Sequence, residues 1–186
     1  MPRPLIVAAT AAEAAHLPEG LEVLVTGIGK TATATALTRH LAGRSDLADL
    51  LLVNLGTAGA LHDAVAQGSG GLFEIGTVIN HDVNADAIRA LGYDPRERLV
   101  IGDAPTVLAS GDVFVTDPAV RARLAAQAEL VDMEGYAVAY VAQELGVPLR
   151  MVKHVSDNAD EGAMEWVALV DRSARVLGDW AASHLG

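Results

Sequence analysis

Apolar runs of strand length alternate along the chain with segments in which apolar residues recur at helical spacing. The run at residues 50–55 (LLLVNL) is almost wholly apolar, which is typical of a central strand covered on both faces. The other apolar runs predict strands at residues 5–9, 22–26, 77–79, 106–108, 113–115, 130–133 and 149–155. Helical spacing predicts helices at residues 31–42, 118–126, 135–145 and 164–184. The turn-rich segments at residues 63–73 and 93–105 are predicted as loops.

Residues at the ends of two predicted helices support these boundaries. Asp117 is an expected N-cap, and Pro118 occupies the first helical position, where its missing N–H costs no hydrogen bond. Gly146 ends the helix at residues 135–145, and Pro148 follows shortly after it. The last helix is amphipathic, and its expected inward residues are Trp166, Leu169, Val170, Leu177 and Trp180.

The alternation of strands and helices defines an α/β fold, and we predict a three-layer α/β/α sandwich. The chain has 186 residues, of which 51% are hydrophobic, so a single domain over residues 1–186 is expected to bury a full core. No internal repeat or linker divides the sequence. In folds of this class ligands bind at the carboxyl ends of the strands, so the residues that follow each strand are candidates for a site.

The charge and the cysteine content exclude several classes of function. The formal net charge is −11 and the basic residues are scattered, so neither nucleic acid nor an anionic membrane is an expected partner. The sequence contains no cysteine, which excludes disulfides and thiolate chemistry and fits a cytoplasmic location. No apolar stretch reaches the ~18 residues of a membrane span. Because Glu13 and His16 follow the first apolar run, residues 5–9 are interpreted as a buried strand rather than as part of a signal peptide.

Two glycine-containing segments follow predicted strands. Gly27, Gly29 and Ala32 fit the dinucleotide pattern G-x-G-x-x-A, but they follow the second strand rather than the first. A Walker A loop is excluded, because Leu24 occupies the position of its first glycine. A tight strand-to-helix turn is therefore the favoured interpretation. Residues 54–60 (NLGTAGA) end the central strand and predict either a simple turn or a small-residue loop that seats a ligand.

Carboxylates follow three of the predicted strands. Glu13 comes after the first strand, and Asp157 follows the strand at residues 149–155. Asp132 and Glu134 flank the end of a third strand. Taken singly, each acid has a structural explanation as a solvated helix residue, a partner of a helix dipole or an N-cap, whereas their convergence at one edge of the sheet predicts a site. The sequence has neither a G-x-S-x-G motif nor histidines at metal-binding spacing, so no metal or cofactor is expected.

Six segments occur in the order typical of the 5′-methylthioadenosine/S-adenosylhomocysteine nucleosidases of the nucleoside phosphorylase superfamily. They are residues 9–13 (ATAAE), 26–30 (TGIGK), 54–61 (NLGTAGAL), 110–114 (SGDVF), 131–135 (VDMEG) and 155–160 (VSDNAD). Together they span nearly the whole chain, and the sequence therefore resembles this family, although Lys153 and His154 replace the more familiar Arg and Ala. The resemblance implies a central mixed sheet within the sandwich, and an enzyme that hydrolyses the N-glycosidic bond of an adenine nucleoside.

The resemblance also implies two catalytic residues. Asp157 is similar to the family's general acid, which protonates N7 of the purine, and Ser156 is similar to the residue that supports it. Glu13 resembles the residue that binds and activates the attacking water. Adenine is a poor leaving group until N7 is protonated, so such an acid must hold its proton near pH 7. Nearby carboxylates stabilise the oxocarbenium-like ribosyl centre, and no metal is required.

The remaining matching residues are implied to bind the substrate. Glu134 resembles the carboxylate that grips the ribose 2′- and 3′-hydroxyls, with Met133 packed on the sugar. Phe114 is similar to the aromatic residue that stacks on adenine, and its neighbour Val113 is assigned to the same site. Thr57 is assigned to the ribosyl side. Family enzymes build part of the 5′ pocket from a partner subunit, so the resemblance implies a homodimer.

Other functions compete with this interpretation. Purine nucleoside phosphorylases bind phosphate through arginines near the first loop and near the G-T-x-G loop, and this sequence lacks both, which favours water over phosphate. Futalosine-type hydrolases tend to carry S-M-E-G and S-N where this chain has residues 132–135 (DMEG) and Ser156-Asp157. A non-catalytic nucleoside-binding or dinucleotide-binding protein is a further alternative. The joint presence of Glu13, Glu134 and Asp157 favours an enzyme.

Overall fold

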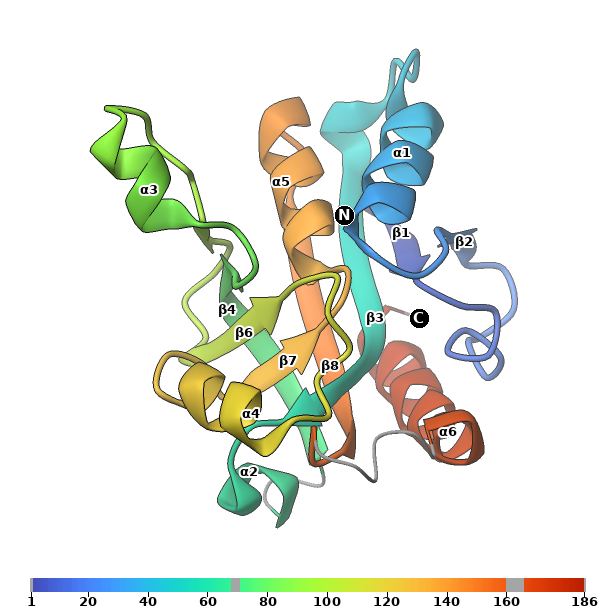
Figure 1. Cartoon of the computed structure of the whole chain (residues 1–186). Helices are drawn as coiled ribbons and strands as arrows, with labels where there is room; N and C mark the ends of the chain where they lie inside the picture. Colours follow the sequence, from blue (N-terminus) through green and yellow to red (C-terminus); the bar gives the residue numbers. More distant parts are fainter. Residues whose placement is uncertain (1, 68–70, 160–165, 186) are drawn as a thin grey trace.

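The computed structural model describes residues 2–67, 71–159 and 166–185. Its strands are β1 (Arg3–Ala8), β2 (Glu22–Val25), β3 (Leu50–Ala60), β4 (Leu72–Asn80), β5 (Arg98–Val100), β6 (Thr106–Ser110), β7 (Leu130–Asp132) and β8 (Leu149–Asp157). Its helices are α1 (Lys30–Leu41), α2 (Asp63–Gln67), α3 (Ala85–Ala90), α4 (Pro118–Ala125), α5 (Gly135–Leu145) and α6 (Trp166–Leu185), with a short 3-10 turn at Leu47–Asp49. The long helices α1, α5 and α6 surround the longest strand, β3 (Figure 1).

The described strands form a single mixed sheet. β3 lies at its centre, between β1 and β8, and pairs with both of them in parallel. The last residues of β3, Gly59 and Ala60, also pair with β7 in the antiparallel direction. Because β8 pairs with β4 as well, strands β3, β7, β6, β4 and β8 close a ring, from which β1 and β2 extend as an open sheet. The predicted central mixed sheet is confirmed.

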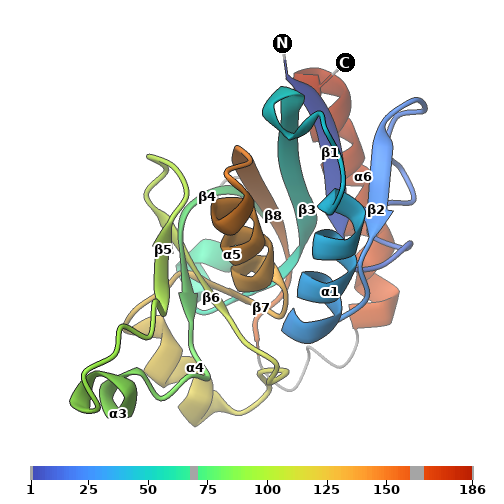
Figure 2. The ribbon, with the colours of Figure 1, turned by 90° about the horizontal axis from the view of Figure 1, so that it is seen from above.

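Alternate residues of the central strands point to opposite faces of the sheet, as the pleat requires. Val7 and Leu52 are buried in the cluster that α1 and α5 cover. Ile6 and Val53 are buried in a second cluster, together with Leu177 of α6. Figure 2 shows α1 and α5 on one side of the sheet and α6 on the other, so the predicted three-layer arrangement is confirmed. Each fully buried aliphatic side chain of this kind contributes about 1.5–3 kcal/mol of transfer free energy.

Several local predictions are wrong, and pairing partners distant in the sequence explain why. Residues 54–60, predicted as a loop, belong to β3, because β8 and β7 supply hydrogen-bond partners along them. The predicted loop at residues 63–73 contains α2 and the start of β4, and the predicted loop at 93–105 contains β5, which pairs with β4. Residues 113–115, predicted as a strand, have no pairing strand among the described residues and form an irregular segment.

The predicted helix boundaries are confirmed at two ends. The Asp117 carboxylate accepts a hydrogen bond from the backbone N–H of Ala119 at 2.7 Å and caps α4. Gly146 closes α5 with φ 65°, a left-handed conformation that glycine adopts without strain. The start of α4 and the end of α5 therefore depend on local interactions that can be predicted from neighbouring residues.

The last helix, α6, buries the face that its sequence predicts. Val170, Leu177 and Trp180 are buried, and Leu169 is half-buried. The predicted start at residue 164 and the side chain of Trp166 lie outside the described residues. Among the helices described, none combines the length and the apolar character that crossing a membrane requires.

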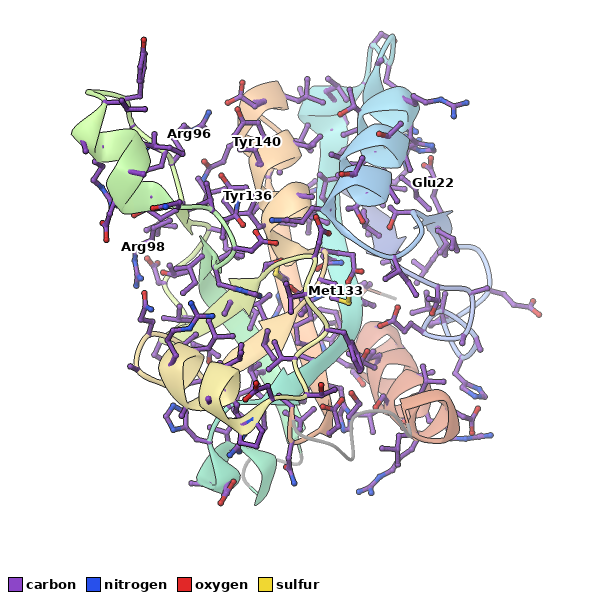
Figure 3. All side chains as sticks on the ribbon, in the orientation of Figure 1. Glu22, Arg96, Arg98, Met133, Tyr136 and Tyr140 are labelled. Carbon is purple, nitrogen blue, oxygen red and sulfur yellow. The ribbon has the colours of Figure 1, made fainter. Side chains whose placement is uncertain are left out.

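The short helix α3 was not predicted from the sequence, and it lies on an arm away from the sheet (Figure 1). Asn84 caps it, since its side chain accepts a hydrogen bond from the backbone N–H of Ala87 at 3.1 Å. Arg96 attaches the arm to α5 (Figure 3): its guanidinium carbon lies 4.5 Å from the ring centroid of Tyr140. The Arg96 carbonyl also accepts a hydrogen bond from the Tyr136 hydroxyl at 2.8 Å. Asn84 is thus the local signal from which this short helix could have been predicted.

Candidate active site

One cavity of about 400 Å³ gathers the residues that the sequence assigns to a site. It lies at the carboxyl ends of β3, β7 and β8, beside the segments that follow β1 and β6. All eight assigned residues line it, namely Glu13, Thr57, Val113, Phe114, Met133, Glu134, Ser156 and Asp157. The volume is in the range of small-molecule sites. Within the described ranges, no group of three or more His, Cys, Asp or Glu side chains is arranged to hold a metal ion.

Glu13 is a buried residue with a fixed orientation, and not a solvated helix residue. Its side chain belongs to the turn after β1, and the residue is 4% exposed. Its Oε1 accepts hydrogen bonds from the N–H and the hydroxyl of Thr57 at 2.8 and 2.9 Å. Its Oε2 accepts from the N–H and the hydroxyl of Thr10 at 3.1 and 3.2 Å. These four bonds occupy the usual acceptor positions of a carboxylate and fix it between the turn and β3.

Glu134 lies immediately before α5 and is 9% exposed. Its Oε1 accepts a hydrogen bond from the backbone N–H of Gly29 at 2.8 Å, which ties it to the turn before α1. Burial first, and then the charge of Asp132, raise the pKa of Glu134 to about 7, against the opposing effects of Lys153 and the Gly29 N–H. The charge of this carboxyl group therefore changes around neutral pH.

We expect Glu134 to make the free energy of unfolding fall as the pH rises from 4.5, its ordinary pKa, to about 7. The folded protein holds this proton more tightly than the unfolded chain, so the stabilisation is complete below pH 4.5 and is lost as the pH passes the folded pKa. The shift corresponds to about 3 kcal/mol. Urea unfolding between pH 4.5 and 8 should show this loss in the wild type relative to Glu134→Gln. A constant difference between the two proteins across that range would contradict it.

Asp157 ends β8 and is half-buried at the cavity. Its Oδ2 accepts a hydrogen bond from the Ser156 hydroxyl at 2.7 Å, and its Oδ1 accepts from the backbone N–H of Ala159 at 2.8 Å. Ala159 itself has φ 49°, a left-handed conformation that costs an alanine about 1–2 kcal/mol. Backbone strain of this kind concentrates at functional sites, and here it belongs to the turn that orients Asp157.

Lys153, which was not predicted as a site residue, forms a buried ion pair with Asp132, one of the predicted acids, which lines the cavity. Lys153 Nζ is 2.9 Å from Asp132 Oδ2, and the two side chains are 2% and 1% exposed. Asp132 Oδ2 also accepts a hydrogen bond from the backbone N–H of Gly135 at 2.9 Å. Burial alone would lower the pKa of Lys153, but the charges of Asp132 and Glu134 raise it. The sequence signal that could have identified this pair is the presence of Lys153 within the predicted strand at residues 149–155.

The glycines of β3 make room for the acids packed against the strand. A Cβ atom added at Gly56 would lie 3.2 Å from both Glu13 Oε1 and Lys153 Nζ. A Cβ atom at Gly59 would lie 2.9 Å from Ala159 Cβ and 3.0 Å from Asp157 Oδ1. The two glycines of this segment are thus explained by the close approach of side chains to a strand whose register shifts between Ala58 and Gly59, and not by a loop.

We expect Gly59→Ala to lower kcat/KM for a nucleoside substrate by about 10- to 100-fold, because the added methyl group displaces the Asp157 carboxylate. The matched control is Gly102→Ala, where a Cβ atom meets no other atom within 4 Å. Steady-state kinetics of the two variants test this, with thermal unfolding as the measure of folding. Equal activity of both variants would show that the contact at Gly59 is unimportant.

Apolar side chains also line the cavity. Phe114 and Val113 follow β6 and are 45% and 52% exposed, while Ile28, from the turn before α1, is 58% exposed. Met133 lies between β7 and α5, near the centre of the molecule (Figure 3), and also lines the cavity. The cavity therefore combines buried carboxylates with an exposed apolar mouth, an arrangement suited to a flat ring joined to a hydroxylated group.

A comparison with protein families identifies the class to which this fold and site belong. The family model of the phosphorylase superfamily matches residues 20–181, and the chain belongs to this superfamily. The match covers the strands and helices from just before β2 into α6.

Within the superfamily, the chain is similar to nucleosidases. It is 32% identical over 121 residues to the aminodeoxyfutalosine nucleosidase of Helicobacter pylori, an alignment that covers 53% of this chain and 52% of that protein. The aligned part thus spans about half the length of that relative. The chain is 29% identical over 171 residues to the 5′-methylthioadenosine/S-adenosylhomocysteine nucleosidase of Shewanella halifaxensis, covering 76% of this chain and 70% of the relative. The predicted resemblance is confirmed.

Solved structures share the fold over nearly the whole chain. A mutant of the futalosine hydrolase of Helicobacter pylori superimposes with a TM-score of 0.83 at 23% identity, covering 98% of each chain. A mutant of the Helicobacter pylori nucleosidase with 5′-methylthioadenosine in its active site gives a TM-score of 0.82 at 23% identity, covering 98% of this chain and 97% of that one. At this level of identity, these likenesses establish the fold.

Proposed function

We propose that the protein hydrolyses the N-glycosidic bond of an adenine nucleoside, 5′-methylthioadenosine or S-adenosylhomocysteine, to adenine and the ribose moiety. The observation that carries the proposal is the convergence of Glu13, Glu134 and Asp157 on one cavity with an apolar wall. The activities named for the similar proteins of Helicobacter pylori and Shewanella halifaxensis support it. Neither a metal nor a cofactor is part of the proposed chemistry.

The proposed substrate lies between the apolar wall and the carboxylates. Its adenine ring stacks on Phe114 beside Val113, and its sugar packs on Met133. Glu134 accepts hydrogen bonds from the ribose 2′- and 3′-hydroxyls. Only the ionised carboxylate accepts from both hydroxyls without offering a competing proton, so binding strengthens as the pH exceeds the Glu134 pKa of about 7.

In the proposed reaction, Asp157 is the general acid. It donates its proton to N7 of adenine as the bond between C1′ and N9 breaks, and the leaving base takes the bonding electrons. Ser156 supports this carboxyl group through the 2.7 Å hydrogen bond between its hydroxyl and Asp157 Oδ2. Protonation converts adenine from a poor leaving group into a neutral one, and a positioned acid of this kind contributes about 10²–10⁴-fold in rate.

Glu13 binds the attacking water and takes one of its protons as the oxygen bonds to C1′. The water needs one of the four acceptor positions on this carboxylate. The longest of the four bonds, at 3.2 Å, comes from the Thr10 hydroxyl, which can rotate away without moving the backbone. Thr57 keeps Oε1 in place on the ribosyl side through its two shorter bonds. The carboxylates around C1′ stabilise the positive charge of the oxocarbenium-like transition state.

A second candidate substrate is an aminodeoxyfutalosine-type nucleoside. The observation that favours it is the 32% identity to the aminodeoxyfutalosine nucleosidase of Helicobacter pylori. The same three carboxylates serve both substrates in this scheme, because a nucleosidase of either kind breaks a ribosyl bond to a base. The two candidates therefore differ in the 5′ substituent that the enzyme prefers, and not in the chemistry.

We further propose that the protein acts as a homodimer in the cytoplasm, within methionine salvage. Ile28, Val113 and Phe114 are each about half exposed at the mouth of the cavity, and a partner subunit that covers them would exclude water from the site. The absence of cysteine from the sequence is in keeping with a reducing compartment.

The deciding experiment measures adenine release from 5′-methylthioadenosine and S-adenosylhomocysteine, with and without inorganic phosphate. Release without phosphate supports a nucleosidase. Release only with phosphate would make the protein a phosphorylase. Release from neither nucleoside, but from aminodeoxyfutalosine, would favour the second candidate, and no release from any of the three would contradict the proposed function.

A further inference from the structure

Lys30 belongs to the glycine segment that resembles a phosphate-binding loop, yet the structure gives its side chain a different set of partners. Its Nζ donates hydrogen bonds to the Asn80 side-chain oxygen at 2.7 Å and to the Asp82 carboxylate. The Lys30 and Asp82 side chains are 17% and 24% exposed. A cation already engaged by a carboxylate and an amide is poorly placed to bind a phosphate group, which Asp82 would repel.

The same residues form a closed circuit with the segment after β6. Asp82 accepts a hydrogen bond from the backbone N–H of Asp112 at 2.7 Å. Asp112 in turn accepts one from the backbone N–H of Lys30 at 2.7 Å. Glycine is required at position 29, because its φ is 92° and an added Cβ atom would lie 3.0 Å from the Asp112 carboxylate. The circuit therefore joins the start of α1, the end of β4 and the segment after β6.

Two walls of the cavity are attached to this circuit. Val113 and Phe114, the proposed adenine-binding residues, directly follow Asp112 in the sequence. Glu134, the proposed ribose-binding residue, accepts its hydrogen bond from Gly29, the neighbour of Lys30. The proposed catalytic carboxylates are instead held by the turn after β1, by β3 and by the turn after β8. The circuit thus touches the groups that bind the substrate and not those that react with it.

We propose that Lys30 is a positioning residue that holds the adenine-binding segment and the ribose-binding carboxylate in the geometry for substrate binding. The proposal rests on the proposed function. Burial raises the pKa of Asp82, but the hydrogen bonds from Lys30 and from the Asp112 N–H outweigh it and lower the pKa below its usual value. Asp82 is therefore ionised at neutral pH, where its ion pair with Lys30 is maintained.

Lys30→Met removes the ammonium group while keeping the length of the side chain. We expect the KM for 5′-methylthioadenosine to rise about tenfold, which corresponds to the loss of one charge-assisted hydrogen bond, with kcat within about threefold of the wild type. Lys30→Arg, which keeps the charge, should recover most of the affinity. Asp82→Asn breaks the same ion pair from the other side and should also raise KM. This variant provides the test if Lys30→Met folds poorly.

The matched control is Arg44→Met, because Arg44 also pairs with carboxylates, those of Glu22 and Asp46, and its side chain is 19% exposed. A merely structural role for Lys30 predicts that both variants lose thermal stability and keep their KM. Equal KM in Lys30→Met and the wild type, a fall in kcat alone, or an equal rise in KM in Arg44→Met would each overturn the proposal.

Hydrogen exchange separates this proposal from the proposed function. We expect the backbone amides of residues 112–114 to exchange faster in Lys30→Met than in the wild type or in Arg44→Met, with no substrate present. If the wild type releases no adenine, this measurement still tests whether Lys30 positions the segment. Unchanged exchange at these residues in Lys30→Met would overturn the positioning role even in an active enzyme.

Discussion

Asp157→Asn is expected to lower kcat for adenine release from 5′-methylthioadenosine by about 10³-fold. The asparagine amide has nearly the same shape, and its carbonyl oxygen can accept one of the two hydrogen bonds that Ser156 and Ala159 donate to the carboxylate. It has no acidic proton to give to N7, so adenine must leave as an anion. Initial rates at saturating substrate, together with the thermal midpoint of each protein, measure the effect.

The control for this variant is Asp86→Asn, which removes a carboxylate whose side chain is fully exposed on α3. It should leave kcat unchanged. A ribosyl substrate with 4-nitrophenolate as its leaving group needs no proton, and Asp157→Asn should lose less than about tenfold on it. Full activity of Asp157→Asn on 5′-methylthioadenosine, or equal losses on both substrates, would contradict the assignment of Asp157 as the acid.

Lys153→Met is expected to lower the free energy of unfolding by about 3–5 kcal/mol at pH 7. The substitution leaves Asp132 buried without its cation, and the Asp132 side chain is only 1% exposed. Because the Lys153 charge also lowers the pKa of Glu134, its removal should raise that pKa above its present value of about 7. Urea unfolding at several pH values measures both effects.

Two further variants separate the buried pair from ordinary surface charge. Arg175→Met breaks an exposed pair with Asp171, whose side chains are 64% and 62% exposed, and should cost less than about 1 kcal/mol. Adding Asp132→Asn to Lys153→Met should recover part of the lost stability, since the unpaired charge is then gone. If the two substitutions are additive, or if Lys153→Met is as mild as Arg175→Met, the buried pair does not stabilise the fold.

Much of the fold can be predicted from short stretches of the sequence. The almost wholly apolar run at residues 50–55 predicts a strand covered on both faces, and this run is the first half of β3. Asp117 and Gly146 mark helix ends through hydrogen bonds and backbone conformations that involve only near neighbours. Such features depend on periodicity and local chemistry, so they can be predicted without any knowledge of the tertiary structure.

Predictions fail where residues far apart in the sequence supply the partner. β5 is three residues long and exists because β4 lies beside it. The second half of β3 reads as a loop because of its glycines, yet β7 and β8 make it a strand. Propensity is a weak guide for such segments, since pairing decides whether they become strands.

Some residues of the candidate site could likewise be predicted from the sequence, whereas others are revealed only by the tertiary structure. The sequence by itself determined which residues follow the strands, so Glu13, Glu134 and Asp157 were predictable candidates. β1, β3 and β8 run parallel and bring their carboxyl ends to one edge of the sheet. β7 runs antiparallel to the end of β3, so it is the pairing of Val131 with Gly59 that places Glu134 at the same cavity. Only the tertiary structure decided that Lys153 balances the buried charge and that Lys30 joins three segments. The physical reason is that hydrogen bonds and ion pairs require contact within about 3–4 Å, and periodicity along the chain carries no information about such contacts between distant segments.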